Sequence, residues 1–126
     1  MPDVTLTNSE WYVLDCLWEH SPLTVMELVE RLSQKVGWAK STTITTLRRM
    51  EEKGLVHCEV TGRTRPYRPL VERRQAVRRE TRSFLNKVYR GSVGLMVSAM
   101  AQDKALTRKE IDELYEILRQ AEEGAK

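Results

Sequence analysis

The most informative pattern in the chain is STTITTLRRMEEKG, residues 41–54. Its pattern predicts a helix that begins with Ser41 as the N-cap and stops at Gly54, because glycine is favoured just past a helix C-terminus. At about 100° per residue, one narrow sector of this helix predicts the buried stripe. That stripe holds Thr43, Leu47, Met50 and Gly54. The opposite face holds Ser41, Thr42, Thr45, Arg48, Arg49 and Glu52, with Ile44 and Thr46 at its margins.

The outward face of this helix has the chemistry of a DNA-reading surface. A helix in the major groove presents short hydrogen-bonding side chains and methyl groups to base edges, while cations beside them contact phosphate. Thr42 and Thr45 are the expected base readers. The candidate DNA contacts on this helix are Lys40, Ser41, Thr42, Ile44, Thr45, Arg48 and Arg49. A merely solvated surface is the alternative, and the mediocre helix propensity of threonine argues against it.

Two amphipathic helices are expected before residue 41, because a capping box opens each of them. Thr7 with Glu10 opens the first, and Thr24 with Glu27 opens the second after a proline-containing break. Both carry apolar residues at helical spacing along one face.

A β-hairpin is expected after the third helix. Residues 55–60 and 66–71 predict two strands joined by a turn with Gly62 at its tip. The prolines of the second strand predict an edge position in a two- or three-stranded ribbon, since proline cannot donate to the ladder. Three helices followed by a short hairpin is the winged-helix order.

The turn of this hairpin, residues 61–66, is the predicted wing. Arg63 and Arg65 lie beside the glycine and can enter a minor groove or contact its phosphates. An ordinary exposed basic turn is the alternative. Both arginines are candidate DNA contacts.

Residues 72–126 predict three further helices. Their apolar faces are too few and too one-sided to close a core, so a second copy of the chain is the simplest partner. The predicted dimer contacts are Phe84, Leu85, Val88, Leu95, Met96, Ile111, Leu114, Ile117 and Leu118. The alternative is that these helices fold back on the N-terminal part of the same chain.

Basic charge is concentrated in the middle of the chain. The 126 residues have a formal net charge of +3, yet residues 35–68 carry eight bases and three acids, and residues 72–90 carry seven bases and two acids. Such a stretch suits a polyanion, because phosphate neutralisation supplies most non-specific affinity for nucleic acid. The arginines at 73, 74, 78, 79 and 82 are expected either to contact the DNA backbone or to pair with partner acids such as Glu110, Glu113 and Glu116.

The sequence argues against an enzyme, a metalloprotein and a membrane protein. It has no catalytic triad, paired-carboxylate, phosphate-loop or nucleophilic-cysteine arrangement. Cys16 and Cys58 lie 42 positions apart, and His20 and His57 lack ligand spacing, so no metal and no cofactor is expected. Without a signal peptide or a run near the ~20 apolar residues that span a bilayer, we expect a cytoplasmic protein without membrane insertion. The thiols are expected to be reduced; redox control through one of them is an alternative.

Several motifs follow one another in a specific order along nearly the whole chain. They are residues 6–11 with 17–18, residues 37–50, residues 53–56, residues 62–63 with Tyr67 and Pro69, and residues 84–85 with Tyr89 and residues 91–92. This ordered set resembles the penicillinase-repressor family of bacterial regulators (BlaI/MecI, with the copper-responsive CopY relatives). The resemblance implies a winged-helix half over residues 1–71 and a helical dimerisation half over residues 72–126. It also implies repression through a two-fold related operator, often of TACA/TGTA type.

Two departures from the family pattern bear on the inducing signal. The scissile Asn-Phe bond of the β-lactam-responsive members aligns with Ala99-Met100, so the sequence does not support induction by cleavage there. Residues 120–126 lack the cysteine-rich tail of the copper-responsive members, so copper sensing through that tail is also unsupported. A membrane sensor-protease or another antirepressor is left open as the inactivating partner.

The sequence thus predicts a mainly α protein with a small β-hairpin, in which a winged helix-turn-helix domain precedes a helical dimerisation region. Its predicted function is that of a bacterial homodimeric transcriptional repressor. Helix 41–53 and the wing would bind double-stranded operator DNA and regulate β-lactam resistance or a related stress response. A protein-interaction module that uses the same surface is the alternative from another class.

Overall fold

The computed structural model describes residues 6–60 and 62–125. Its contacts divide the chain into two units, Met1–Thr81 and Arg82–Lys126, so the division falls within helix α4 (Arg73–Tyr89). The functional boundary predicted between residues 71 and 72 stays a prediction. The fold class is confirmed: a winged-helix unit precedes a set of C-terminal helices.

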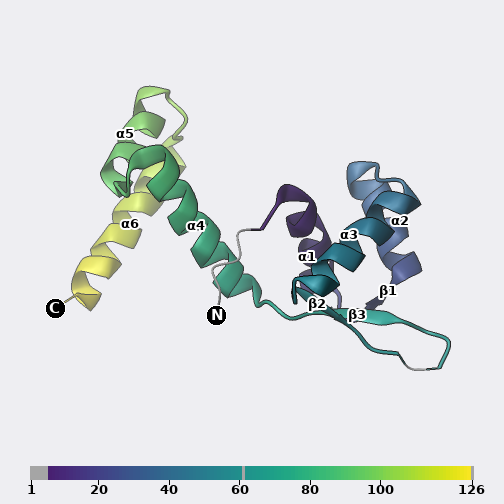
Figure 1. Ribbon diagram of the computed structural model, residues 1–126. Helices are drawn as coiled ribbons and strands as arrows, with labels where there is room; N and C mark the ends of the chain where they lie inside the picture. The colour runs from purple at the N-terminus through teal and green to yellow at the C-terminus, as the bar shows by residue number, and fades with distance from the viewer. Residues whose placement is uncertain (1–5, 61, 126) are drawn as a thin grey trace. The chain divides into compact units, whose positions relative to one another are not determined.

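The first unit packs three helices against a small sheet (Figure 1). The helices are α1 (Asn8–Glu19), α2 (Val25–Val36) and α3 (Lys40–Glu52). Each contributes an apolar stripe to one shared core, which excludes water from the helices' inner faces. The most deeply buried core side chains are Val13, Leu14, Cys16, Leu17, Leu28, Leu32, Leu47, Met50, Leu55 and Val56.

Both capping boxes predicted in the first unit are confirmed. Thr7 accepts from the backbone N–H of Glu10, and the Glu10 carboxylate accepts from that of Thr7. Thr24 and Glu27 form the same reciprocal pair at the start of α2. These bonds satisfy backbone donors that a helix N-terminus otherwise leaves unpaired.

The predicted start of the third helix and the predicted burial of Gly54 are wrong, whereas the helix stops before Gly54 as predicted. The N-cap of α3 is Ala39, which makes no side-chain cap bond, and Ser41 lies inside the first turn. The Ala39 carbonyl already accepts from Thr42 and Thr43, so the helix starts two residues earlier than predicted. Gly54 is exposed rather than part of the buried stripe. Its φ of +78° reverses the backbone beyond the helix, where the 100° periodicity no longer applies.

The sheet corrects the expectation that the second hairpin strand is an edge strand. Its order is β1 (Leu23–Thr24), β3 (Pro66–Pro69), β2 (Val56–Cys58), with both pairs antiparallel, so β3 lies in the centre. The prolines are tolerated because they stand at the two ends of a short strand and keep their carbonyls. The Pro66 carbonyl accepts from the N–H of Glu59 at 2.8 Å. Sequence reasoning missed β1 altogether.

The second unit consists of the end of α4, then α5 (Val93–Gln102) and α6 (Arg108–Gly124). The predicted capping box of Thr107 and Glu110 opens α6. Between residues 82 and 125, none of the described side chains is fully buried. Over the described part of the chain, no helix combines the length and the apolar character needed to cross a membrane.

Candidate nucleic-acid interface

Helix α3 separates its side chains into an inner and an outer face, as predicted. Thr43, Leu47 and Met50 are at most 1% exposed and anchor the helix in the core. The side chains that project outward are Lys40, Ser41, Thr42, Thr45, Arg48 and Arg49, all exposed. Ile44 and Thr46 are half-buried at the margins. The buried stripe therefore determines which residues a ligand of this helix can reach.

The hydroxyl groups of the outer face differ in their availability. Thr46 donates its hydroxyl to the carbonyl of Thr42 at 2.8 Å, within the helix itself. In contrast, the side chains of Ser41, Thr42 and Thr45 make no hydrogen bond within the described part of the chain. Their hydroxyls can both donate and accept, which suits the edges of bases.

Five exposed cations belong to the candidate interface. Lys40, Arg48 and Arg49 are on α3, and Arg63 and Arg65 are on the wing. Among residues 6–60 and 62–125, none of the five forms an ion pair. Their charge is therefore available to an anion outside the chain. A neighbouring arginine behaves differently, because Arg68 pairs with Glu59 across the hairpin at 2.9 Å.

The predicted wing is a loop between β2 and β3. Figure 1 shows this loop projecting beyond the three helices of its unit. Gly62 has a φ of +61°, a left-handed conformation that glycine adopts without steric cost, and Arg63 and Arg65 beside it are exposed. Residue 61, the first residue of the predicted wing, lies outside the described residues.

Two long-range polar contacts that sequence reasoning missed hold this framework together. The indole N–H of Trp18 donates to the carbonyl of Val71 at 2.9 Å, which joins α1 to the segment after the wing. The ammonium of Lys53 lies 2.6 Å from the carboxylate of Glu10, which joins the end of α3 to the start of α1. The capping motif marks Glu10 in the sequence, but nothing marks Lys53 as its partner.

The pKa of the Glu10 carboxyl is lowered although the side chain is buried. Its side chain is only 5% exposed, and this burial by itself would raise its pKa. The hydrogen bonds from Lys53 and from Thr7 favour the charged form more strongly, so the pKa lies below its ordinary value.

The two cysteines are free and lie in different surroundings. Cys16 is completely buried, and burial raises the pKa of its thiol, which disfavours the reactive thiolate. Cys58 is half-buried on β2, opposite Tyr67 of β3. Burial, together with the neighbouring Cys58, raises the pKa of Tyr67 to about 12. Of the two thiols, that of Cys58 is thus the more accessible to solvent.

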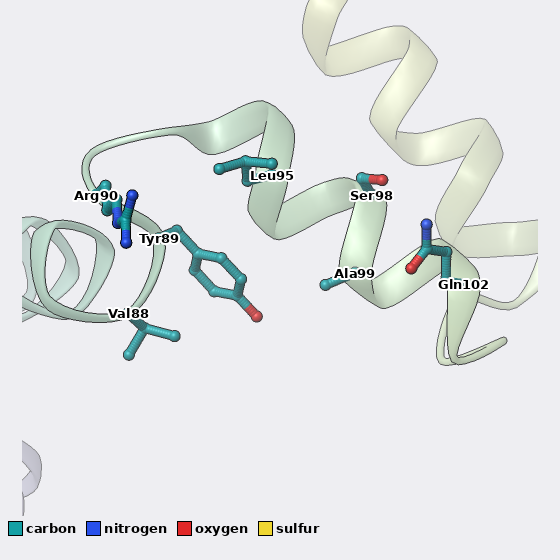
Figure 2. Close-up of a pocket in the computed structure, with 7 residues that line it drawn as sticks. All are labelled: Val88, Tyr89, Arg90, Leu95, Ser98, Ala99 and Gln102. Carbon is teal, nitrogen blue, oxygen red and sulfur yellow. The ribbon is translucent and has the colours of Figure 1, made fainter.

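The residues predicted to form the dimer are only partly covered in the second unit. Phe84, Val88, Leu95, Ile117 and Leu118 are 49–63% exposed, and Leu85, Met96, Ile111 and Leu114 are half-buried. A hollow of about 390 Å³ lies between the end of α4 and α5. Figure 2 shows Tyr89 on one side of it and Leu95, Ser98, Ala99 and Gln102 along α5 on the other.

Helix α4 also carries five arginines, most of them exposed. Arg73, Arg74, Arg78 and Arg82 are exposed, and Arg79 is half-buried. Both roles expected for them, contact with DNA and contact with a partner's acids, stay predictions.

Comparison with known proteins gives one consistent result. The family model described as "Penicillinase repressor" matches residues 6–120. The penicillinase repressor of Bacillus licheniformis is 31% identical over 113 residues, covering 90% of this chain and 88% of that protein. The methicillin resistance regulatory protein MecI of Staphylococcus aureus is 26% identical over 113 residues, covering 90% of this chain and 92% of that protein.

A solved structure supports the same relationship for the winged-helix unit. It is the solution structure of the monomeric form of B. licheniformis BlaI in complex with the blaP half-operator, similar with a TM-score of 0.52 and 26% identity. The match covers 57% of this chain and 88% of that one. The chain therefore belongs to the penicillinase-repressor (BlaI/MecI) family of winged-helix transcriptional repressors, which are not enzymes.

Proposed function

We propose that this protein is a homodimeric repressor that binds a two-fold symmetric operator, with α3 in the major groove and the wing on the flanking DNA. The observation that carries the proposal is the outer face of α3, where unpartnered hydroxyls lie among cations that form no ion pair in the described residues. Hydroxyls and cations that find no partner within the chain are suited to a polar, anionic ligand.

Each group on this face has a role in the proposal. Thr42 and Thr45 contact base edges, and Ile44 packs on a thymine methyl group. Lys40, Ser41, Arg48 and Arg49 contact phosphate or bases beside them, while Arg63 and Arg65 contact the minor groove or its phosphates. The complex of the similar BlaI with a half-operator supports DNA as the ligand.

The second unit supplies the two-fold symmetry. We propose that a second copy covers its exposed apolar side chains, including Val88 and Leu95 at the hollow of Figure 2. Covering such a surface is favourable because apolar area leaves water. Two α3 helices then lie about one helical turn of DNA apart, or slightly more, and the operator shows the matching symmetry.

We further propose that the regulated genes serve β-lactam resistance or a related stress response, in line with the names of the relatives. The inactivating partner is a membrane sensor-protease or another antirepressor. Cleavage at the bond between Ala99 and Met100 is not part of the proposal.

The proposal is tested by fluorescence anisotropy with the duplex from upstream of the gene and a scrambled duplex, at several salt concentrations. We expect a preference of ~1000-fold or more for the upstream duplex, with two chains per site. Thr45→Ala should reduce this preference, whereas the control Ser33→Ala, at an exposed position near the C-terminus of α2, should not. Equal, steeply salt-sensitive binding to both duplexes would refute sequence-specific repression.

A further inference from the structure

One carboxylate joins the ends of two helices in the winged-helix unit. Glu10 is the third residue of α1, and its Oε1 accepts from the N–H of Thr7 at 2.9 Å. Its Oε2 accepts from Nζ of Lys53 at 2.6 Å, and Lys53 is the C-cap of α3. The anion thus lies at a helix N-terminus and the cation at a helix C-terminus, where each interacts favourably with the helix dipole.

This contact differs in kind from the other contacts between α1 and α3. Core residues such as Leu47 and Met50 are held by apolar packing, which is strong but has no preferred direction. A charge-assisted hydrogen bond to a side chain that is 95% buried is directional, because its atoms must meet within about 3 Å. The ion pair therefore limits how α3 can rotate or slide on the core.

The position of Lys53 extends this effect to both parts of the candidate interface. It follows the last residue of α3, Glu52, and precedes the reversal at Gly54 that leads into β2. The backbone N–H of Lys53 donates to the carbonyl of Arg49, on the last turn of α3. A displacement of Lys53 would move the end of α3 and the start of the hairpin together.

We propose that Glu10 is a positioning residue for DNA recognition: through Lys53 it holds α3 in the orientation in which Thr42 and Thr45 meet the bases. The inference rests on the proposed function of α3 and adds a residue that touches no DNA. Because the side chain of Lys53 is 47% exposed, direct contact between Lys53 and phosphate is the competing explanation.

Glu10→Gln separates the two explanations by the sign of its effect. Glutamine keeps the capping oxygen for Thr7 but removes the charge that faces Lys53. Loss of a negative charge by itself should leave DNA binding unchanged or strengthen it on both duplexes. Misplacement of α3 should instead weaken binding to the upstream duplex by about 10-fold or more, as the loss of one base-reading hydrogen bond does, with scrambled-duplex affinity unchanged within about twofold.

Lys53→Met is the second variant. If Glu10→Gln does not fold, Lys53→Met by itself still distinguishes positioning from a direct bond to phosphate. Positioning predicts the same selective loss, with an unchanged salt dependence on the scrambled duplex. A direct bond from Lys53 to phosphate predicts weaker binding to both duplexes and a salt slope lower by about 0.9 for each phosphate that is no longer neutralised. If Glu10 acts through Lys53, the double variant should lose no more affinity than the worse single variant.

The matched control is Lys35→Met. Lys35 pairs with Glu19 at 3.2 Å and also joins two helices, α1 and α2, but both side chains are about half exposed. This variant should leave the preference for the upstream duplex unchanged, because any loss of general charge attraction affects both duplexes alike. Circular dichroism at the assay temperature confirms that each variant is folded. Tighter or unchanged binding of Glu10→Gln to the upstream duplex would overturn the inference, whereas failure of the wild type to prefer that duplex would refute the proposed function itself.

Discussion

Replacing Thr43 with valine should stabilise the winged-helix unit and leave DNA binding unchanged. Thr43 is completely buried on the inner face of α3, and its hydroxyl has no hydrogen-bond partner among the described residues. Valine has nearly the same shape and a similar helix propensity, with a methyl group in place of the hydroxyl. The substitution removes an unpaired polar group from the core without opening a cavity.

The expected gain follows from the energetics of buried hydroxyl groups. An unpaired buried polar group costs about 1–3 kcal/mol. We expect the lower end of this range, about 1 kcal/mol, because the hydroxyl is small and its surroundings can relax. For a unit of this size that gain raises Tm by about 4–8 °C. With an m-value of about 2 kcal/mol/M, it raises the urea midpoint by about 0.5 M.

The assay is urea and thermal unfolding followed by circular dichroism. Protein concentration must be the same for each variant, since association of folded chains shifts the apparent stability. Thr45→Val is the matched control, because it makes the same chemical change on the exposed face of α3. It should alter the free energy of unfolding by less than about 0.5 kcal/mol and should weaken binding to the upstream duplex.

Two results would contradict this assignment of Thr43. A less stable Thr43→Val variant would mean that the hydroxyl has a partner that stabilises the fold. Loss of DNA affinity in Thr43→Val, with none in Thr45→Val, would mean that the inner and outer faces of α3 are assigned the wrong way round.

Four further outcomes are expected. Arg63→Ala should weaken binding to all DNA sequences and lower the salt slope by about 0.9 for each phosphate that Arg63 neutralises, measured by anisotropy. Leu118→Asp should shift sedimentation towards the monomer and reduce operator affinity, because Leu118 is 63% exposed in the single chain and belongs to the predicted dimer surface. The lowered pKa of Glu10 stabilises the fold above its ordinary pKa of 4.5. The free energy of unfolding of the wild type should therefore fall as the pH drops from 4.5 towards the lower pKa that Glu10 has in the folded state. In an acid titration this fall should be steeper than that of Glu10→Gln. An alkylating reagent at neutral pH should modify Cys58 and spare Cys16 until the chain unfolds, as mass spectrometry would show; rapid labelling of Cys16 would contradict its burial.

The outer face of α3 was predictable because its information is local. A period of 3.6 residues separates Leu47 and Met50 from Thr45 and Arg49, and the buried stripe confirms that separation. The capping boxes at Thr7 and Thr24 were predictable for the same reason, since both partners lie within one helical turn.

The errors lie where neighbouring residues do not carry the information. Ser41 has the better capping side chain, yet the helix begins after Ala39, whose carbonyl accepts the first helical bonds. The prolines of β3 suggested an edge strand, but its second neighbour is β1, which lies more than 40 residues earlier and consists of only two residues. No periodicity can be recognised in so short a strand.

The side chains that α3 exposes and the capping boxes followed from the sequence because they depend on spacings within one helix, and the family followed from the order of short motifs along the chain. The central position of β3, the bond from Trp18 to Val71 and the contact of Glu10 with Lys53 across 43 positions became visible only in the folded chain. Such contacts form between residues distant in the chain, whose approach depends on how whole elements pack around a common core.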